Sequence, residues 1–416
     1  MLKPNNSIAE KEDLSFRETT CPACGHQIAV PFFSGGNQPL ATLAWPASET
    51  QAQAMPRLPL DFVRCVHCGH IFNTAFRYED VPYSEKPNLM FNKGRVWSEF
   101  IRELQERICS VLHESPCVVE IGHGDGSFLH GLSQIIPKAR IVGFDPHGEC
   151  GMHRSVIFRT ELFKPEIHLK ELAPDMIISR HVLEHLVNPV GFLQSIAFCA
   201  CRLGRTVEGY FEAPCIDRVL STGRTVDLYY EHSSQFTTRS FSIMLNRCGA
   251  EMLAMEHSYD GEVISAFLRL GNKSISKTIA QEAEQYQRHA RESLGVIKKQ
   301  LDALFQSGRT VVIWGGTGKS AAFMNRYGCD SARFPLVVDS DLDKVRSHVP
   351  GTGQTIRFRD ELKGRRVDVV LIPPQWRAKD IVKEMSEIGI DACTILIEHQ
   401  GRLIDFRRDD HPYARP

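Results

Sequence analysis

The chain has 416 residues, which exceeds what a single hydrophobic core accommodates, so we predict two or three domains. Its 49 Lys and Arg residues balance 50 Asp and Glu residues, which leaves no basic surplus to attract nucleic acid or an anionic membrane. The sequence contains no apolar run of the roughly 18 residues that a membrane helix requires and no apolar signal-peptide core, so we expect a cytoplasmic protein.

Two short cysteine motifs near the N-terminus share the pattern C-x2-C followed by Gly-His. The glycine lets the chain turn and aim backbone amides at the sulfurs, and four thiolates are common ligands of a structural Zn²⁺. We therefore predict one zinc ion bound by Cys21, Cys24, Cys65 and Cys68. Nearby histidines could replace one of these ligands: His26, His67 and His70.

The residues between the two motifs include Pro39, Pro46, Pro56 and Pro59, and we predict a long loop there. An aromatic segment, FRYEDVPYSEKPNLMF, then leads out of this first domain. Tyr78 or Tyr83 could reach an active site from this linker, and packing of the linker itself is an equal alternative.

A glycine-rich loop follows a helix that we predict at 97–112. In CVVEIGHGDGSF, residues 117–128, a β-branched strand ends in an acid, and alternate glycines precede apolar residues at helical spacing. Such glycines let a ligand approach the backbone at a helix N-terminus. Because the acid would repel a pyrophosphate, we predict that the loop binds the cationic ligand S-adenosylmethionine (SAM). The residues concerned are Glu120, Gly122, Gly124 and Gly126.

The next predicted strand, ARIVGFDP, ends in Asp145 about twenty residues after the loop. An acid at this place can accept hydrogen bonds from ribose hydroxyls, as in dinucleotide-binding folds. The combination of Glu120 and Asp145 favours SAM, although an NAD site would share Asp145 and stays open at this point.

The segment PDMIISRHVLEHLVNPVGF predicts a buried strand, a loop and a helix that starts near Asn188 and Pro189. His181 and His185 are four residues apart, so a helix would place them on one face. Without a third ligand we do not expect a metal there. We place His181 near the cofactor and His185 near the acceptor, and ordinary capping or core roles remain open.

A dense polar cluster occurs in DLYYEHSSQF, ahead of a predicted helix start at Thr237 and Thr238. A histidine beside a carboxylate is the simplest general base near neutral pH, and a phenol can donate to a developing oxyanion. Tyr229, Glu231 and His232 are therefore candidate catalytic residues; the alternative is a solvated loop.

The C-terminal part begins with an amphipathic helix that we predict from Ser274 to Phe305. A second strand–loop–helix follows in TVVIWGGTGKSAAFM. It is not a P-loop, because Ile313 occupies a required glycine position. It fits a dinucleotide fingerprint at Gly316-x-Gly318-x-x-Ala321 with Asp339 ending the next strand, so an NAD-dependent oxidoreductase is one alternative. Lys319 could instead bind a phosphate-bearing acceptor, or the loop could be purely structural.

Several segments together resemble the sugar C-methyltransferase family, whose members use SAM to methylate keto-sugar nucleotides. The matching segments are the cysteine motifs, NQPLA, EIGHGDG, LYYEHSSQF, WGGTGKSAAFMN, VVDSDLDK and VPGT. The sequence departs from the family pattern at Tyr230, where histidine is common, and at 341–344, where Asn-Pro-x-Lys is usual.

The resemblance implies an α/β protein with a class I methyltransferase Rossmann-like core. It further implies a small N-terminal zinc module and a second, C-terminal Rossmann-like α/β domain that covers the acceptor without a nicotinamide role. We set the boundaries at residues 1–85, 86–272 and 273–416. We expect no nucleic-acid or membrane partner, and a monomer or homodimer.

The expected reaction is methylation of a carbon next to a carbonyl group in a small acceptor, such as a nucleotide-linked keto-deoxysugar. His232, oriented by Glu231, would remove the α-proton, while Tyr229 and His185 stabilise the enolate and Tyr83 lies near them. O- or N-methylation of another metabolite is the first alternative. A zinc-stabilised binding protein without activity is another.

Overall fold

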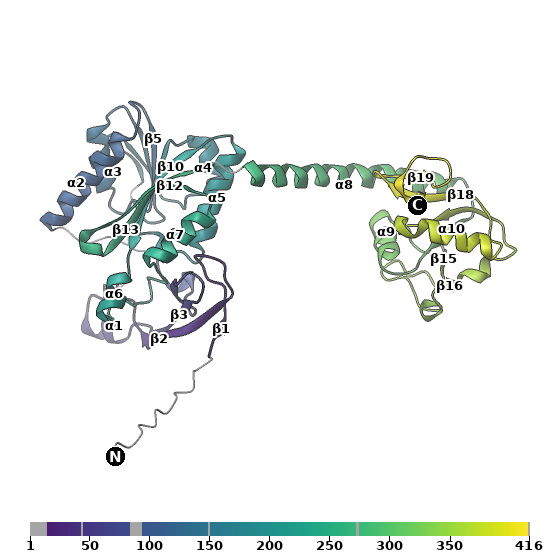
Figure 1. The fold of residues 1–416 in the computed structure, drawn as a ribbon, viewed down its shortest axis with the longest axis horizontal. Helices are drawn as coiled ribbons and strands as arrows, with labels where there is room; N and C mark the ends of the chain where they lie inside the picture. The colour runs from purple at the N-terminus through teal and green to yellow at the C-terminus, as the bar shows by residue number, and fades with distance from the viewer. Residues whose placement is uncertain (1–14, 43–44, 84–93, 149, 272–273, 415–416) are drawn as a thin grey trace, which may run out of the picture. The chain divides into compact units, whose positions relative to one another are not determined.

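The computed structural model describes residues 15–42, 45–83, 94–148, 150–271 and 274–414. The chain divides into two compact units, Met1–Thr278 and Ile279–Pro416, which are considered separately below (Figure 1). Among the described residues, no helix combines the length and the apolar character that crossing a bilayer would require.

The first unit begins with a small antiparallel sheet that carries both cysteine motifs. Its strands, in spatial order, are β1 (Arg17–Glu18), β2 (Ile28–Gln38), β3 (Leu58–Cys65), β4 (Ile71–Asn73) and β11 (Ser234–Gln235). The last strand comes from far along the sequence and pairs with β4. We call residues 15–83 the N-terminal module.

The long loop predicted between the cysteine motifs is wrong, because the segment contains β2, the short helix α1 (Glu49–Gln53) and β3. The prolines are accommodated at the margins of these elements: Pro39 directly follows β2, and Pro56 precedes β3. Pro31 lies inside β2, where a register shift between Pro31 and Phe33 interrupts the pairing with β3. Residues 84–91 of the predicted linker lie outside the described residues.

A larger sheet forms the centre of the first unit. Its spatial order is β12 (Glu251–Ser258), β13 (Val263–Leu270), β10 (Val207–Pro214), β9 (Met176–Arg180), β5 (Cys117–Ile121), β6 (Arg140–Phe144), β8 (Val156–Arg159) and β7 (Gly151–His153). Strands β5, β6, β8, β9 and β10 are parallel, and β13 runs antiparallel to β10. The chain order reverses at β5, so its carboxyl end borders the crevice where doubly wound sheets bind ligands.

Helices cover both faces of the central sheet (Figure 1). They are α2 (Arg95–Ser110), α3 (Ser127–Ile135), α4 (Pro165–Leu172), α5 (Pro189–Arg202) and α7 (Thr238–Arg247). The short helix α6 (Asp217–Thr222) instead packs, through Val219, in the core of the N-terminal module. Alternate residues of β5 serve the two faces: Val118 packs in the core with α2 and α3, and Val119 in the core with α4, α5 and α7.

The predicted helix starts near Asn188–Pro189 and at Thr237–Thr238 are confirmed, because both helices begin there with an N-terminal cap. Asn188 accepts from the Gly191 N–H at 3.0 Å with Pro189 in the first helical position. Thr237 caps α7 in a reciprocal box with Ser240.

The second unit is another α/β sheet, with spatial order β16 (Ile356–Phe358), β15 (Leu336–Asp339), β14 (Val311–Trp314), β17 (Val367–Leu371), β18 (Ala392–His399) and β19 (Arg402–Asp405). All pairings are parallel except that of β19. The predicted long helix is confirmed as α8 (Ser274–Gln306). The helices α8 and α9 (Lys319–Tyr327) pack on one core of this sheet, and α10 (Ala378–Glu387) on the other. The predicted second Rossmann-like domain is therefore confirmed.

Candidate active site and metal cluster

The glycine loop after β5 adopts a backbone that side chains would obstruct. Gly122, Gly124 and Gly126 all have positive φ values, of 75°, 56° and 69°. A Cβ atom on Gly122 would lie 2.3 Å from Cγ2 of Val182, and one on Gly126 would lie 2.7 Å from the Phe158 ring. The loop leads directly into α3, so it forms a tight backbone cradle at a helix N-terminus.

Glu120 is the penultimate residue of β5, and its side chain is almost completely buried, at 2% exposure. One oxygen lies 3.9 Å from Arg180, and the other has no hydrogen-bond partner among the described residues. Burial raises the pKa of Glu120 to about 8, although Arg180 opposes this. A buried carboxyl oxygen without a donor fits the ammonium group of SAM, and the side-chain-free cradle fits a bulky ligand.

Asp145 follows β6 and braces the same loop. Its Oδ2 accepts from the Gly124 N–H at 3.2 Å, and its Oδ1 accepts from the His147 N–H at 2.9 Å. Each carboxylate oxygen has a second lone pair, which could accept from a ribose hydroxyl as predicted.

A buried network of charges lies beside the cradle, and the sequence reasoning missed most of it. Arg180 at the end of β9 donates to Glu212 of β10 at 2.9 Å, in direct register across the two strands. Arg180 and His181 outweigh the effect of burial and lower the pKa of Glu212 to about 2. The available signal was a pair of charged residues ending neighbouring apolar strands, in IISR and GYFE.

His181 belongs to this network and bridges two carboxylates. Its ring nitrogens lie 3.5 Å from Glu184 and 3.3 Å from Glu212. Burial favours the neutral ring, but hydrogen bonds to the two carboxylates prevail and raise the pKa of His181 to about 9. His181 has a left-handed φ of 52°, so it does not share a helix face with His185, which ends the short 3-10 helix Leu183–His185.

A cavity of about 270 Å³ brings His181 together with Tyr229 and His232. Its walls include aromatic and aliphatic side chains from Trp97, Ile216, Val219 and Tyr259. Two acids, Asp227 and Glu262, contribute to the lining, and Arg224 holds both through hydrogen bonds. The predicted polar cluster therefore faces a cavity of a size for a small organic group rather than forming a solvated loop.

His232 and Tyr229 form the polar centre of this cavity. The Tyr229 hydroxyl lies 2.9 Å from Nε2 of His232. Burial and the neighbouring His185 lower the pKa of His232 to about 3, so the ring is neutral at physiological pH. Burial raises the pKa of Tyr229, which keeps its proton. The pair thus offers a neutral base and an O–H donor side by side.

Glu231 does not orient His232 as predicted. Its Oε1 instead accepts from the backbone N–H groups of Ala41 and Thr42, at 2.8 and 2.7 Å, and from the Thr42 hydroxyl at 3.2 Å. Consecutive side chains leave the backbone in different directions, so the carboxylate of Glu231 turns to the N-terminal module while His232 lines the cavity.

His185 and Tyr83 meet next to this pair. Nδ1 of His185 lies 2.7 Å from the Glu231 carbonyl oxygen and 3.1 Å from the Tyr83 hydroxyl. The carbonyl can only accept, which assigns the proton of a neutral His185 ring to Nδ1. The His185 and His232 rings meet edge to face at 4.9 Å. The possibility that Tyr83 reaches the site from the linker is therefore realised.

Glu184, His185 and His232 also place one ligand atom each within 4.8 Å of one another, a spacing that could hold a metal ion. The hydrogen bonds of His185 to a carbonyl and of His232 to a hydroxyl suit acid–base work better than ligation. His181 is not a member of this group.

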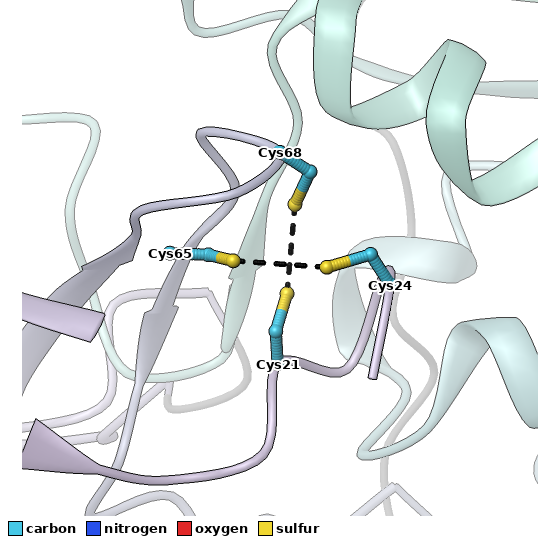
Figure 2. Close-up of side chains that lie close together, drawn as sticks. All are labelled: Cys21, Cys24, Cys65 and Cys68. Atoms are coloured by element: carbon cyan, nitrogen blue, oxygen red, sulfur yellow. Dashed lines mark hydrogen bonds between the residues drawn. The ribbon is translucent and has the colours of Figure 1, made fainter. Parts of the chain in front are cut away.

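The four cysteines of the N-terminal motifs converge on one point (Figure 2). Their sulfurs lie 3.6 Å apart for Cys21 and Cys68 and 3.7 Å apart for Cys24 and Cys65. A tetrahedral Zn²⁺ with bonds of about 2.3 Å needs ligand separations of about 3.8 Å, so the cluster fits a zinc site.

The turns of both cysteine motifs repeat one geometry. Gly25 and Gly69 have φ values of 74° and 78°, and each donates its N–H to the carbonyl of the first cysteine. His70 takes no part in the cluster, because its Nε2 pairs with Ser234 at 3.2 Å.

The glycine loop of the second unit repeats the bracing of the first. Oδ2 of Asp339 accepts from the Gly316 N–H at 3.1 Å, as Asp145 does from Gly124. A Cβ atom on Gly316 would lie 2.3 Å from Ile356, just as one on Gly122 would lie 2.3 Å from Val182. Nζ of Lys319 lies 5.7 Å from the centre of the Trp376 ring. Nothing in this geometry resembles the buried acid with an open oxygen at Glu120.

Two protein-family models match the chain. A methyltransferase domain matches residues 92–255, and the C-methyltransferase C-terminal domain matches residues 256–397. The protein is thus a SAM-dependent methyltransferase. The two matches adjoin each other, and the chain belongs to the SAM-dependent C-methyltransferase family. The loop at Gly316 lies inside the second match.

Solved methyltransferase structures also align with the chain. Mitomycin 7-O-methyltransferase MmcR is 14% identical over 42% of this chain and 55% of its own, with a TM-score of 0.31. Magnesium protoporphyrin IX methyltransferase ChlM from Synechocystis PCC 6803 was solved with bound S-adenosylhomocysteine (SAH). It is 17% identical over 42% of this chain and 81% of its own, with a TM-score of 0.30. The plantazolicin methyltransferase BpumL in complex with SAH is 15% identical over 44% of this chain and 87% of its own, with a TM-score of 0.33. The alignment thus spans about half of MmcR. No curated protein matches the chain.

Proposed function

We propose that the protein methylates a carbon atom next to a carbonyl group in a small metabolite, such as a nucleotide-linked keto-deoxysugar. The observation that carries the proposal is the pair of a neutral His232 and a protonated Tyr229 in one cavity, 2.9 Å apart. Carbon acids need a base and an oxyanion donor, whereas a nucleophilic oxygen or nitrogen needs at most a base. The match of 256–397 to the C-methyltransferase C-terminal domain supports the same choice.

In the proposed reaction, the neutral ring of His232 removes the α-proton of the acceptor. The Tyr229 hydroxyl donates to the carbonyl oxygen as negative charge develops there. The carboxylate of Glu184 raises the pKa of His232 against the effect of burial, so it stabilises the imidazolium that results. The enolate carbon of the acceptor is then the nucleophile in methyl transfer.

Residues of the cradle hold and orient the methyl donor in this proposal. Glu120 would accept from its ammonium group, Asp145 from its ribose hydroxyls, and the loop at Gly122 would approach it with bare backbone. When bound, SAM supplies an electrophilic methyl group. In-line positioning of the acceptor carbon is the remaining requirement on the cavity.

The experiment begins with mass spectrometry of small molecules retained on the protein purified in the presence of SAH, followed by screening of keto-sugar nucleotides and related ketones as acceptors. With an acceptor found, exchange of its α-proton for deuterium from solvent is measured in the presence of SAH. We expect exchange by the wild type and none by His232→Ala. A product that carries its methyl group on oxygen or nitrogen would decide for the alternative reaction.

We also propose that the four-cysteine cluster binds Zn²⁺ in a structural role. Four protein ligands complete a tetrahedral ion and leave no position for a substrate. Metal analysis of the purified protein should return about one zinc per chain. The proposal further places the protein in the cytoplasm with a small-molecule acceptor, no nucleic-acid or membrane partner, and a monomeric or homodimeric state.

A further inference from the structure

The side chains of residues 229–232 contact two different parts of the first unit, the cavity and the N-terminal module. Tyr229 and His232 line the cavity. Tyr230 and Glu231, which lie between them in the sequence, reach separate segments of the N-terminal module. The hydroxyl of Tyr230, at the position where the family commonly has histidine, turns to the module.

The side chain of Tyr230 is fully buried and fastens the turn at 77–80. Its hydroxyl donates to Oδ2 of Asp80 at 2.9 Å and accepts from the Arg77 N–H at 3.0 Å. Arg77 also pairs with Asp80 at 3.4 Å, and the Phe76 ring packs 5.2 Å from the Tyr230 ring. One hydroxyl therefore fixes both the backbone and the acid of this turn.

The fastened turn packs against the tyrosine that reaches His185. Tyr78, on the turn, stacks on Tyr83 with ring centres 5.0 Å apart. Tyr83 in turn contacts Nδ1 of His185 and the Glu231 carbonyl oxygen. The carbonyl and the side chain of Glu231 thus hold two different segments, since its carboxylate anchors the backbone at Ala41 and Thr42.

We propose that Tyr230 and Glu231 are positioning residues, which fasten residues 41–42 and 77–83 of the N-terminal module to the catalytic segment so that Tyr83 and the Glu231 carbonyl hold His185 in its Nδ1-protonated form. With the proton on Nδ1, Nε2 is the hydrogen-bond acceptor of the ring. The catalytic consequence rests on the proposed function, but the arrangement itself is measurable without an acceptor.

The first test reads the His185 ring directly. The full chain is labelled with ¹⁵N-histidine, saturated with SAH, and its histidine tautomers are read by long-range ¹H–¹⁵N correlation, with His185→Gln assigning the signal. We expect the wild type to show the Nδ1-protonated ring and Tyr230→Phe to show a mixture of tautomers. Tyr286→Phe, on an exposed part of α8, is the matched control and should leave the signal unchanged. An unchanged His185 in Tyr230→Phe, with faster hydrogen exchange at 77–83, would overturn the link to His185.

The second test separates anchoring from orientation of the base. The amide oxygen of Glu231→Gln can still accept from the Ala41 and Thr42 N–H groups, whereas Glu231→Ala cannot. We expect hydrogen exchange at these two amides to rise at least about tenfold in the alanine variant, for a lost buried hydrogen bond, and to change little in the glutamine variant. Equal exchange in all three proteins would overturn the anchoring role.

Neither readout depends on turnover, so the two proposals can fail independently. If no α-proton exchange or C-methylated product is found while the tautomer and amide results appear as expected, the positioning role stands and the proposed reaction falls. If His232→Ala abolishes α-proton exchange while Tyr230→Phe leaves both His185 and the 77–83 amides unchanged, the proposed reaction stands and the positioning role is wrong.

Discussion

The phenol oxygen of Tyr83 lies 3.1 Å from Nδ1 of His185, although the two residues are 102 positions apart in the sequence. The first comes from the N-terminal module and the second from the loop after β9. Their contact brings the module next to the candidate catalytic residues.

Tyr83→Phe removes this hydroxyl and keeps the ring. We expect methyl transfer to slow about tenfold, because one buried hydrogen bond to a catalytic imidazole is lost. The dissociation constant of SAH should stay within about twofold, since the hydroxyl of Tyr83 bonds to His185 and the Glu231 carbonyl rather than to Glu120 or Asp145. Single-turnover rates and calorimetry measure the two quantities; a selective loss of SAH affinity would contradict the assignment.

Binding of SAH should release a proton through Glu120. Burial raises the pKa of this carboxyl to about 8, so it is mostly protonated at pH 7 in the free protein, and a bound ammonium group would favour its ionised form. Affinity should therefore rise with pH between 6 and 8, by up to about tenfold per unit. Titration calorimetry in buffers of different ionisation enthalpy measures the release.

Glu120→Gln is the companion variant for this measurement. It should bind SAH about tenfold to a hundredfold more weakly, because a charge-assisted hydrogen bond is lost, and should release no proton. Proton release that persists in this variant would assign the titration to another group of the network, such as His181.

The protein should lose stability as the pH falls below 6.5, partly through His232. The unfolded ring takes up a proton near pH 6.5, whereas the folded ring does so only near pH 3, so acid favours the unfolded state. Between pH 7 and pH 5, the free energy of unfolding of the wild type should fall by up to about 2 kcal/mol more than that of His232→Gln. Urea unfolding at the two pH values tests this; parallel losses in both proteins would contradict it.

Cys24→Ser removes one thiolate from the four-cysteine cluster. We expect zinc content to fall well below one ion per chain and the unfolding midpoint to decrease, because structural zinc binding contributes to folding free energy. Cys393→Ser changes an exposed cysteine outside the cluster and serves as control. A variant that keeps one zinc would require another ligand, with His67 and His26 nearest in the sequence.

Gly122→Ala tests the cofactor cradle. The added methyl group would lie 2.3 Å from Val182 in a backbone of positive φ, so the loop must move and SAH affinity should fall about tenfold or more. Gly223→Ala has a similar φ of 68° with open space around its Cβ, and it controls for the backbone cost alone. Equal SAH affinity in both variants would mean that Gly122 is not close to the ligand.

Periodicity and turn chemistry predicted much of the fold, because these signals are local. The acid-ended glycine loop, the capped starts of α5 and α7, and the long helix α8 were all visible as spacing of apolar, capping and glycine residues. The two strands between the cysteine motifs were missed, since prolines were given more weight than the Phe- and Val-rich runs around them.

For the candidate site, what could be predicted depended on whether a residue's partners are close in the sequence. Glu120, Asp145, Tyr229 and His232 could be named because each stands at a strand end or in a compact polar cluster. The roles of Glu231 and Tyr230 could not, because their partners at 41–42 and 77–80 are brought near only by the tertiary fold. The charges of Arg180 and Glu212 are likewise explained by the register of β9 against β10, which no local pattern encodes.

The pairing of β11 with β4 has a consequence for how the chain is made. The sheet that carries the cysteine motifs is completed by residues 234–235, which leave the ribosome long after residue 73. During synthesis, the outer edge of β4 therefore stays unpaired until β11 has been made.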